Sequence, residues 1–181
     1  DNRLSERMAK LAEKYSGNGF SDEGVAITFA EILISFGINP AQIQVIDASG
    51  LSRQNKMTAH VLAQLLYKIH SDPLLSKLID GLPVGGKTGT LQSRYIKTAP
   101  DAIGLVKAKT GTLTGTVSLA GYVQSGDREY AFAIIADKIG RTNSASDRAR
   151  KTVDRYLAKI AAPLAIPTPE SATVTAQVQT L

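Results

Sequence analysis

The residues best suited to chemistry form the run Lys109-Thr110-Gly111-Thr112, at the end of segment 103–112. In this segment Lys107 and Lys109 alternate with small apolar residues, which predicts a β-strand with both ammonium groups on one face. Gly111 leaves space for another group to lie against the strand. A held lysine, two hydroxyls and an accessible backbone would suit the binding of an anion and of a developing oxyanion.

A second Lys-Thr-Gly-Thr run starts at Lys87, inside a stretch from Gly81 to Thr88 that matches the P-loop pattern. A P-loop leaves a buried strand and opens directly into a helix. Here residues 74–80 predict a helix, and residues 89–95 begin with glycine and have no helical stripe. A nucleotide hydrolase is therefore the weaker alternative, and Lys109, rather than Lys87, is the candidate functional lysine.

The elements that would position Lys109 can be predicted from hydrophobic periodicity. Helices are expected from Leu4 to Gly17, from an N-cap at Ser21 to Phe36-Gly37, after an N-cap at Thr58, after Asp72-Pro73, and from about Ser146 to Ala161. The stripe of the first helix is Leu4, Met8, Leu11 and Tyr15, and that of the last is Val153, Tyr156, Leu157 and Ile160. Strands at 103–112, 116–124 and 129–137, joined by glycine-containing turns, predict an antiparallel meander.

This order predicts an α+β fold. Residues 1–100 form a mostly helical part, residues 101–161 a three-strand meander plus a packing helix of the same domain, and residues 162–181 an irregular tail. A three-stranded sheet with an open edge is incomplete, so we expect further strands from sequence outside this chain.

Composition narrows the function classes. The 181 residues include no cysteine, which excludes disulfides and thiol catalysis, and no apolar run long enough for a transmembrane span. The net charge of +5 is spread without a basic block, so nucleic acid is not an expected partner. His60 and His70 lack neighbouring acids at ligand spacing, and Asp47, Ser49 and Ser52 read as turn-forming loop residues. No metal site and no cofactor are expected.

Four segments in order resemble the class C low-molecular-mass penicillin-binding proteins, which are bacterial D-alanyl-D-alanine carboxypeptidases. Asp1-Asn2 with the helix behind it resembles their Ser-Asp-Asn motif, and 47–53 resembles their Asp-Gly-Ser-Gly-Leu-Ser-Arg loop, with Ala48 for glycine. Residues 89–94 resemble their Gly-Ser/Thr-Leu segment, and 108–112 with 119–122 their catalytic Lys-Thr-Gly strand and the strand after it. The resemblance runs from Asp1 to about Ala161 and implies a penicillin-binding/β-lactamase-like fold.

The resemblance also implies a serine acyl-enzyme that acts on peptidoglycan peptides ending in D-Ala-D-Ala, is acylated by β-lactams and resides outside the cytoplasm, in the periplasm or at the cell wall. By position, Asn2 would bond the substrate amide and Lys109 would assist proton transfer. The hydroxyls of Thr110 and Thr112 beside Gly111 would bind the terminal carboxylate, and the Thr112 N–H would serve as an oxyanion-hole donor.

One part of the family pattern is missing, because no serine here has a lysine three residues later. The Ser-x-x-Lys nucleophile is therefore expected in an N-terminal part of the same protein, with this chain a cleavage product or a partial sequence. The alternative from another class is a non-catalytic peptidoglycan-binding module that kept the strand and lost the nucleophile.

Overall fold

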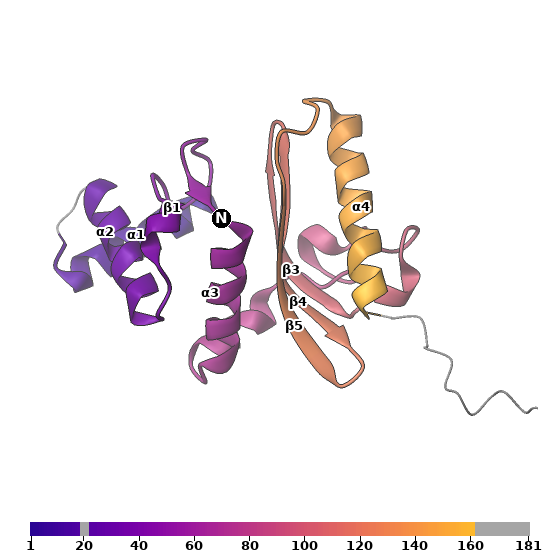
Figure 1. Cartoon of the computed structure of the whole chain (residues 1–181), viewed down its shortest axis with the longest axis horizontal. Coiled ribbons are helices and arrows are strands. Elements are labelled where there is room, and N and C mark those ends of the chain that lie inside the picture. Colours follow the sequence, from indigo (N-terminus) through magenta and orange to yellow (C-terminus); the bar gives the residue numbers. More distant parts are fainter. Residues whose placement is uncertain (19–21, 162–181) are drawn as a thin grey trace, which may run out of the picture.

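The structure is a computed structural model that describes residues 1–18 and 22–161. It is a helical part followed by a sheet with one helix on each face (Figure 1). The helices are α1 (Asn2–Ser16), α2 (Asp22–Ser35), α3 (Ala59–Ser71) and α4 (Asn143–Ala161). Short 3-10 helices are η1 (Pro40–Gln42), η2 (Leu75–Gly81), η3 (Gly89–Leu91) and η4 (Pro100–Ala102). The strands are β1 (Ile43–Gln44), β2 (Lys56–Met57), β3 (Val106–Leu113), β4 (Thr116–Ser125) and β5 (Arg128–Ala136).

The first two helices of the helical part, α1 and α2, lie where the sequence predicted them. Helix α1 ends at Gly17, whose φ of 78° is the left-handed conformation that stops helices, and Thr58 caps α3 by accepting from Val61 N. Strands β1 and β2 pair antiparallel, and a small core of Leu33, Ile38 and Val61 joins α2 to α3. The expected N-cap Ser21 lies outside the described residues.

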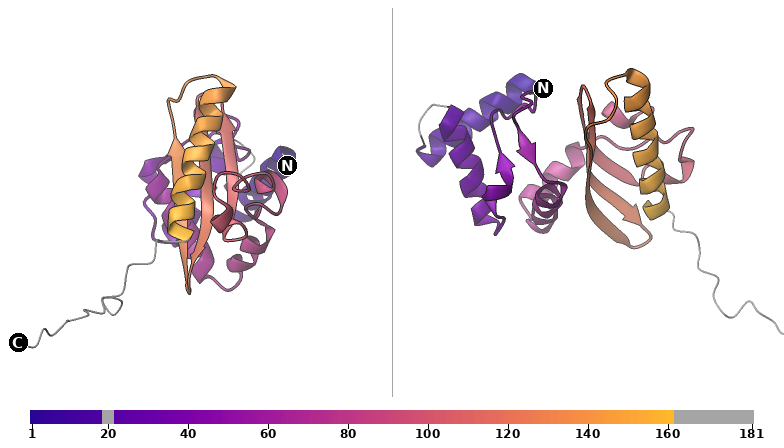
Figure 2. Two further views of the ribbon diagram at one scale, coloured as in Figure 1. Left: turned by 90° about the vertical axis from the view of Figure 1, so that its right-hand side faces the viewer. Right: turned by 45° about the horizontal axis from the view of Figure 1, so that its top comes forward.

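The main sheet has the order β3-β4-β5, all antiparallel, as the meander predicted. Helix α3 packs on one face and α4 on the other, and Figure 2 shows the same layers from two further directions. The α4 face holds the larger core, which includes Val106 and Ala108 of β3, Leu119 of β4 and Leu157 of α4. The stretch before β3 joins this core through Leu91, Tyr95 and Ala99.

The expected starts of two elements need correction. Strand β3 starts at Val106, not Ile103, because η4 and Gly104, with a φ of 82°, turn the chain first. Helix α4 starts at Asn143, three residues before the expected Ser146, whereas the short helix expected after Asp72-Pro73 is present as the 3-10 helix η2.

The apolar stripes also differ from expectation. Leu4, Met8, Leu11 and Tyr15 on α1 are 48% to 86% exposed instead of packed. On α4, Val153 and Leu157 are buried, but Tyr156 and Ile160 are exposed. Periodicity shows which residues share a face, but not whether the described residues cover that face.

Candidate functional site

Lys109 lies on the sheet face that is turned toward the helical part. On that face Lys107 sits directly opposite Tyr122 in the β3–β4 register, and the Tyr122 hydroxyl donates to Leu66 O of α3 at 2.7 Å. Since side chains alternate along a strand, Lys109 shares this face and Thr110 and Thr112 lie on the α4 face. Lys109 therefore lies on one face of β3, and Thr110 and Thr112 lie on the other.

The backbone of Thr110 and Thr112 points to the outer edge of the sheet. Leu105 O accepts from Gln124 N at 2.8 Å, which makes these two residues a hydrogen-bonded pair. Because such pairs alternate in an antiparallel ladder, the odd-numbered residues of β3 bond to β4 and the even-numbered ones face outward. The Lys109 ammonium reaches this edge too, since Nζ donates to Thr110 O at 2.6 Å.

The first half of this edge is covered by the stretch from Gly81 to Thr88. Ala108 N donates to Pro83 O at 2.9 Å, and Gly85 N donates to Val106 O at 2.8 Å. Beyond Ala108 the edge opens, and neither Thr110 N nor Thr112 N has a backbone partner within the described residues. Donors at the edge of a rigid sheet are the arrangement that an oxyanion requires.

The same geometry does not support the P-loop alternative. The segment before Gly81 is the 3-10 helix η2, and the one after Thr88 is the three-residue η3, so neither the required strand nor the required helix is present there. The Thr88 hydroxyl accepts from Val84 N at 2.9 Å and is used inside the turn. Lys87 lies against Gly104, whose missing side chain leaves it room.

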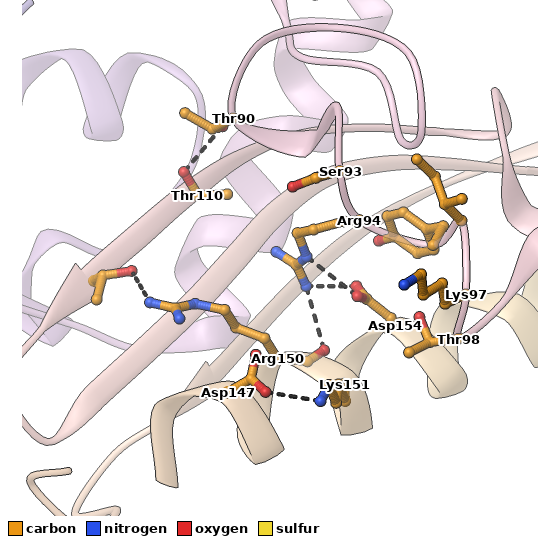
Figure 3. A pocket seen from close by; sticks show the side chains of 13 residues that line it. Thr90, Ser93, Arg94, Lys97, Thr98, Thr110, Asp147, Arg150, Lys151 and Asp154 are labelled. Carbon is orange, nitrogen blue, oxygen red and sulfur yellow. Dashed lines mark hydrogen bonds and ion pairs between the residues drawn. The ribbon is translucent and has the colours of Figure 1, made fainter. Parts of the chain in front are cut away.

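The two threonine hydroxyls are held by residues from other elements (Figure 3). Thr110 Oγ1 donates to Thr90 Oγ1 at 3.1 Å, and Arg150 of α4 donates through Nη2 to Thr112 Oγ1 at 3.4 Å. Neither Thr90 nor Arg150 was expected at the site from sequence. For Thr90 the sequence offered a signal, because Gly89-Thr90-Leu91 resembles the family's Gly-Ser/Thr-Leu segment. For Arg150 it offered none, because nothing in the sequence distinguishes it from a surface arginine.

Gly111 sits opposite Ser118 in the register, and a side chain at this position would come within 2.2 Å of the Ser118 hydroxyl. The expected close approach to a glycine therefore exists, but the approaching group is a serine of β4. Because that hydroxyl ends a short rotatable side chain, the packing requirement for glycine here is moderate.

Asn2 stands in the first turn of α1, where the Asp1 carboxylate caps the helix by accepting from Arg3 N at 2.9 Å and Leu4 N at 3.2 Å. Figure 1 and the right-hand view of Figure 2 place this end of the helical part on the side that faces the sheet. Among the described residues no hydrogen bond joins Asn2 to Lys109, whose Nζ donates to Thr110 O instead.

The loop 47–55 ties α1 to the end of β3. Glu6 of α1 accepts from Ser49 N at 2.8 Å, and Arg53 donates to Thr114 O at 3.2 Å, just past β3. Partial burial alone would raise the pKa of Asp47, but hydrogen bonds from Asn55, Ser52 and Gly50 outweigh it and hold this pKa below its usual value. As expected, Asp47 and Ser52 make turn hydrogen bonds, since Asp47 accepts from Gly50 N and the Ser52 hydroxyl accepts from Gln54 N, whereas Ser49 bonds to α1.

A buried ion pair anchors the segment that carries Thr90. Arg94 forms a two-point contact with Asp154 of α4, at 2.5 Å and 3.3 Å, and the two side chains are only 11% and 4% exposed. Arg94 also donates to Arg150 O at 3.4 Å. The next residue, Tyr95, is buried with a φ of 71°, a strained conformation for a tyrosine.

Other candidate chemistry is sparse in residues 1–18 and 22–161. No group of three potential metal-ligating side chains occurs there, and no helix combines the length and hydropathy needed to cross a bilayer. His70 pairs with Glu129 at 2.9 Å, which links α3 to β5 and is a packing role.

Comparison with known proteins matches this arrangement. The model of the D-Ala-D-Ala carboxypeptidase 3 (S13) family matches residues 1–160. Carboxypeptidase DacB of Mycolicibacterium smegmatis is 38% identical over 78% of this chain and 32% of its own length. D-alanyl-D-alanine carboxypeptidase of an Actinomadura species is 36% identical over 75% of this chain and 26% of its own. The chain therefore spans about a third or less of these relatives.

Solved structures agree. Penicillin binding protein 4 of Haemophilus influenzae superposes with a TM-score of 0.75 and 26% identity, over 87% of this chain and 36% of that one. A second structure of it, complexed with a β-lactam, gives a TM-score of 0.74. The expected penicillin-binding α+β fold is thus confirmed, with a sheet that is small and incomplete here. By sequence and by fold, the chain belongs to the S13 family of D-Ala-D-Ala carboxypeptidases.

Proposed function

We propose that this chain is the C-terminal portion of a bacterial serine D-Ala-D-Ala carboxypeptidase/endopeptidase that cleaves peptidoglycan stem peptides through an acyl-enzyme. β-Lactams acylate the same serine, which is carried with its lysine in a Ser-x-x-Lys motif on the N-terminal part of the protein. Such a substrate places the enzyme outside the cytoplasm, in the periplasm or at the cell wall.

The observation that carries this proposal is the open edge of β3. Lys109 Nζ lies at Thr110 O, and the Thr112 N–H faces outward without a backbone partner in the described residues. A nucleophile that approached this edge would meet a cation and an oxyanion donor already in position. Preorganised donors of this kind are worth about 3 kcal/mol each in the transition state.

The remaining roles follow from the same placement. The hydroxyls of Thr110 and Thr112, each fixed by a hydrogen bond, receive the carboxylate of the terminal D-alanine next to Gly111. Asn2, on the side of the helical part that faces the sheet, bonds the amide of the penultimate residue. Lys109 supplies positive charge and helps to move the proton of the attacking serine.

The test compares the two lysines of the duplicated tetrapeptide in the protein with its N-terminal part present. Labelled penicillin should acylate the wild type, and Lys109→Ala should slow acylation by about two to three orders of magnitude. Lys87→Ala is the matched control and should change the rate by less than about threefold, since Lys87 lies in a turn. The reverse ranking would show that the wrong triplet has been assigned.

The second candidate is a peptidoglycan-binding module without catalysis, favoured by the lack of any Ser-x-x-Lys motif in these 181 residues. It predicts reversible binding of D-Ala-D-Ala peptides with no covalent adduct, even in the presence of the N-terminal part. Mass spectrometry after penicillin treatment separates the two, because an adduct of one penicillin per protein occurs only with a nucleophile.

A further inference from the structure

A cavity of about 650 Å³ adjoins the two threonines on the α4 face of β3 (Figure 3). Thr110 and Thr112 line it at the strand, residues 93–98 line another side, and α4 contributes Arg150 and Asp154 among others. This volume is in the range that accommodates a small-molecule ligand, far more than the methyl group of one D-alanine fills. The proposed function leaves most of it unused.

The charges that line the cavity do not balance. Four cations and two carboxylates give an excess of two positive charges. Asp154 forms an ion pair with Arg94, and Asp147 forms one with Lys151 at 2.8 Å. The hydrogen bond and charge of Lys151, with a smaller effect of Arg150, hold the pKa of Asp147 below its usual value.

Two cations remain outside those ion pairs, and they have different surroundings. Arg150 donates to Thr112 Oγ1, so its charge acts on the proposed carboxylate site itself. Lys97 is exposed, has no ion-pair partner among the described residues, and lies beyond the Arg94–Asp154 pair from Arg150 in Figure 3. The cavity therefore has one cation near the threonines and a second one further away.

We infer that this cavity is a subsite for the leaving-group side of the substrate, and that Lys97 recognises a second acidic group there. The inference rests on the proposed function, in which Thr110 and Thr112 bind the carboxylate of the residue that leaves. The side chain of that leaving residue would then enter the cavity beside the two threonines. A carboxylate that reaches Lys97 gains charge pairing, and a neutral group of the same shape does not.

The test uses the protein with its N-terminal part and acyl-D-Ala-X substrates, in which X is D-glutamate, D-glutamine, D-2-aminoadipate or the side-chain amide of D-2-aminoadipate. We expect kcat/KM to favour at least one acid over its amide by about threefold to fivefold, the size of one partly exposed ion pair. That preference should fall to about one in Lys97→Met and weaken as ionic strength rises. Lys77→Met removes the same charge outside the cavity and should keep the preference.

Arg150→Met should behave differently, because it contacts Thr112: kcat/KM should fall for acid and amide alike, mainly through KM. Penicillin acylation of the wild type serves as the reference. A wild type that is not acylated refutes the proposed function and the subsite with it. An acylated wild type that lacks the preference for either acid, or a preference that survives Lys97→Met, overturns the subsite alone.

Discussion

Replacing Arg94 by methionine should strongly destabilise the protein. The change leaves the Asp154 carboxylate, 4% exposed, without the cation that contacts both its oxygens. Removing one partner of a buried ion pair costs about 3 to 5 kcal/mol, against a total stability of about 5 to 15 kcal/mol for a domain. With a urea m-value of about 2 kcal/mol per M, the unfolding midpoint should fall by about 1.5 to 2.5 M.

Two controls separate the buried charge from lost contacts. Arg94→Met combined with Asp154→Leu removes both charges and should recover most of the lost stability, because an apolar pair of similar volume needs no desolvation of ions. Lys151→Ala breaks the exposed pair with Asp147, whose side chains are 51% and 54% exposed, and should cost less than about 0.5 kcal/mol. A loss below about 1 kcal/mol in Arg94→Met would refute the reasoning, since the buried pair would then behave like an exposed one.

Two further outcomes concern neighbouring residues of β4, Gly121 on the α4 face of the sheet and Tyr122 on the α3 face. Gly121→Ala should cost about 3 kcal/mol or more of unfolding free energy, because its Cβ would lie 2.1 Å from Lys107 O, and a backbone atom in a paired strand cannot move away as a side chain can. Burial, with a smaller effect of the Glu129 charge, raises the pKa of Tyr122 from 10.0 to about 12. Ultraviolet absorbance at alkaline pH should therefore show its tyrosinate forming near pH 12. The stability that Tyr122 contributes should be complete below pH 10 and be lost as pH rises through about 12, whereas Tyr122→Phe should lack that loss; a pKa near 10.0 would contradict the buried bond to Leu66.

Local sequence patterns predicted most of the elements, because they depend on neighbours in the chain. The alternation before Lys109 gave strand β3, Gly17 ended α1 and Thr58 capped α3. The apolar stripe of α1 was placed on one face correctly, but its exposure was not foreseen. Exposure depends on which surfaces are present to cover a face, and a periodic pattern has no information on that.

The contacts that shape the candidate site were beyond such patterns, because they join residues far apart in sequence. Arg94 and Asp154 are 60 positions apart, and Arg53 and Thr114 are 61. An arginine that is buried in an ion pair looks the same in sequence as one that faces solvent. Only the packing of residues 89–98 against α4 brings Arg94 to Asp154 and Arg150 to Thr112.

The duplicated tetrapeptide shows how far context decides function. Lys87-Thr88-Gly89-Thr90 and Lys109-Thr110-Gly111-Thr112 have the same composition and order, yet only the second lies on a strand. In the first, the Thr88 hydroxyl closes a turn and Thr90 supports Thr110, so one copy helps to position the other. The open part of the strand edge leaves Thr110 N and Thr112 N of the second copy facing outward, whereas Lys87 N and Thr88 N of the first copy both donate to Val84 O within a turn. The proposed chemistry therefore depends on the open part of the β3 edge beyond Ala108, and a search for the motif alone would weight the two copies equally.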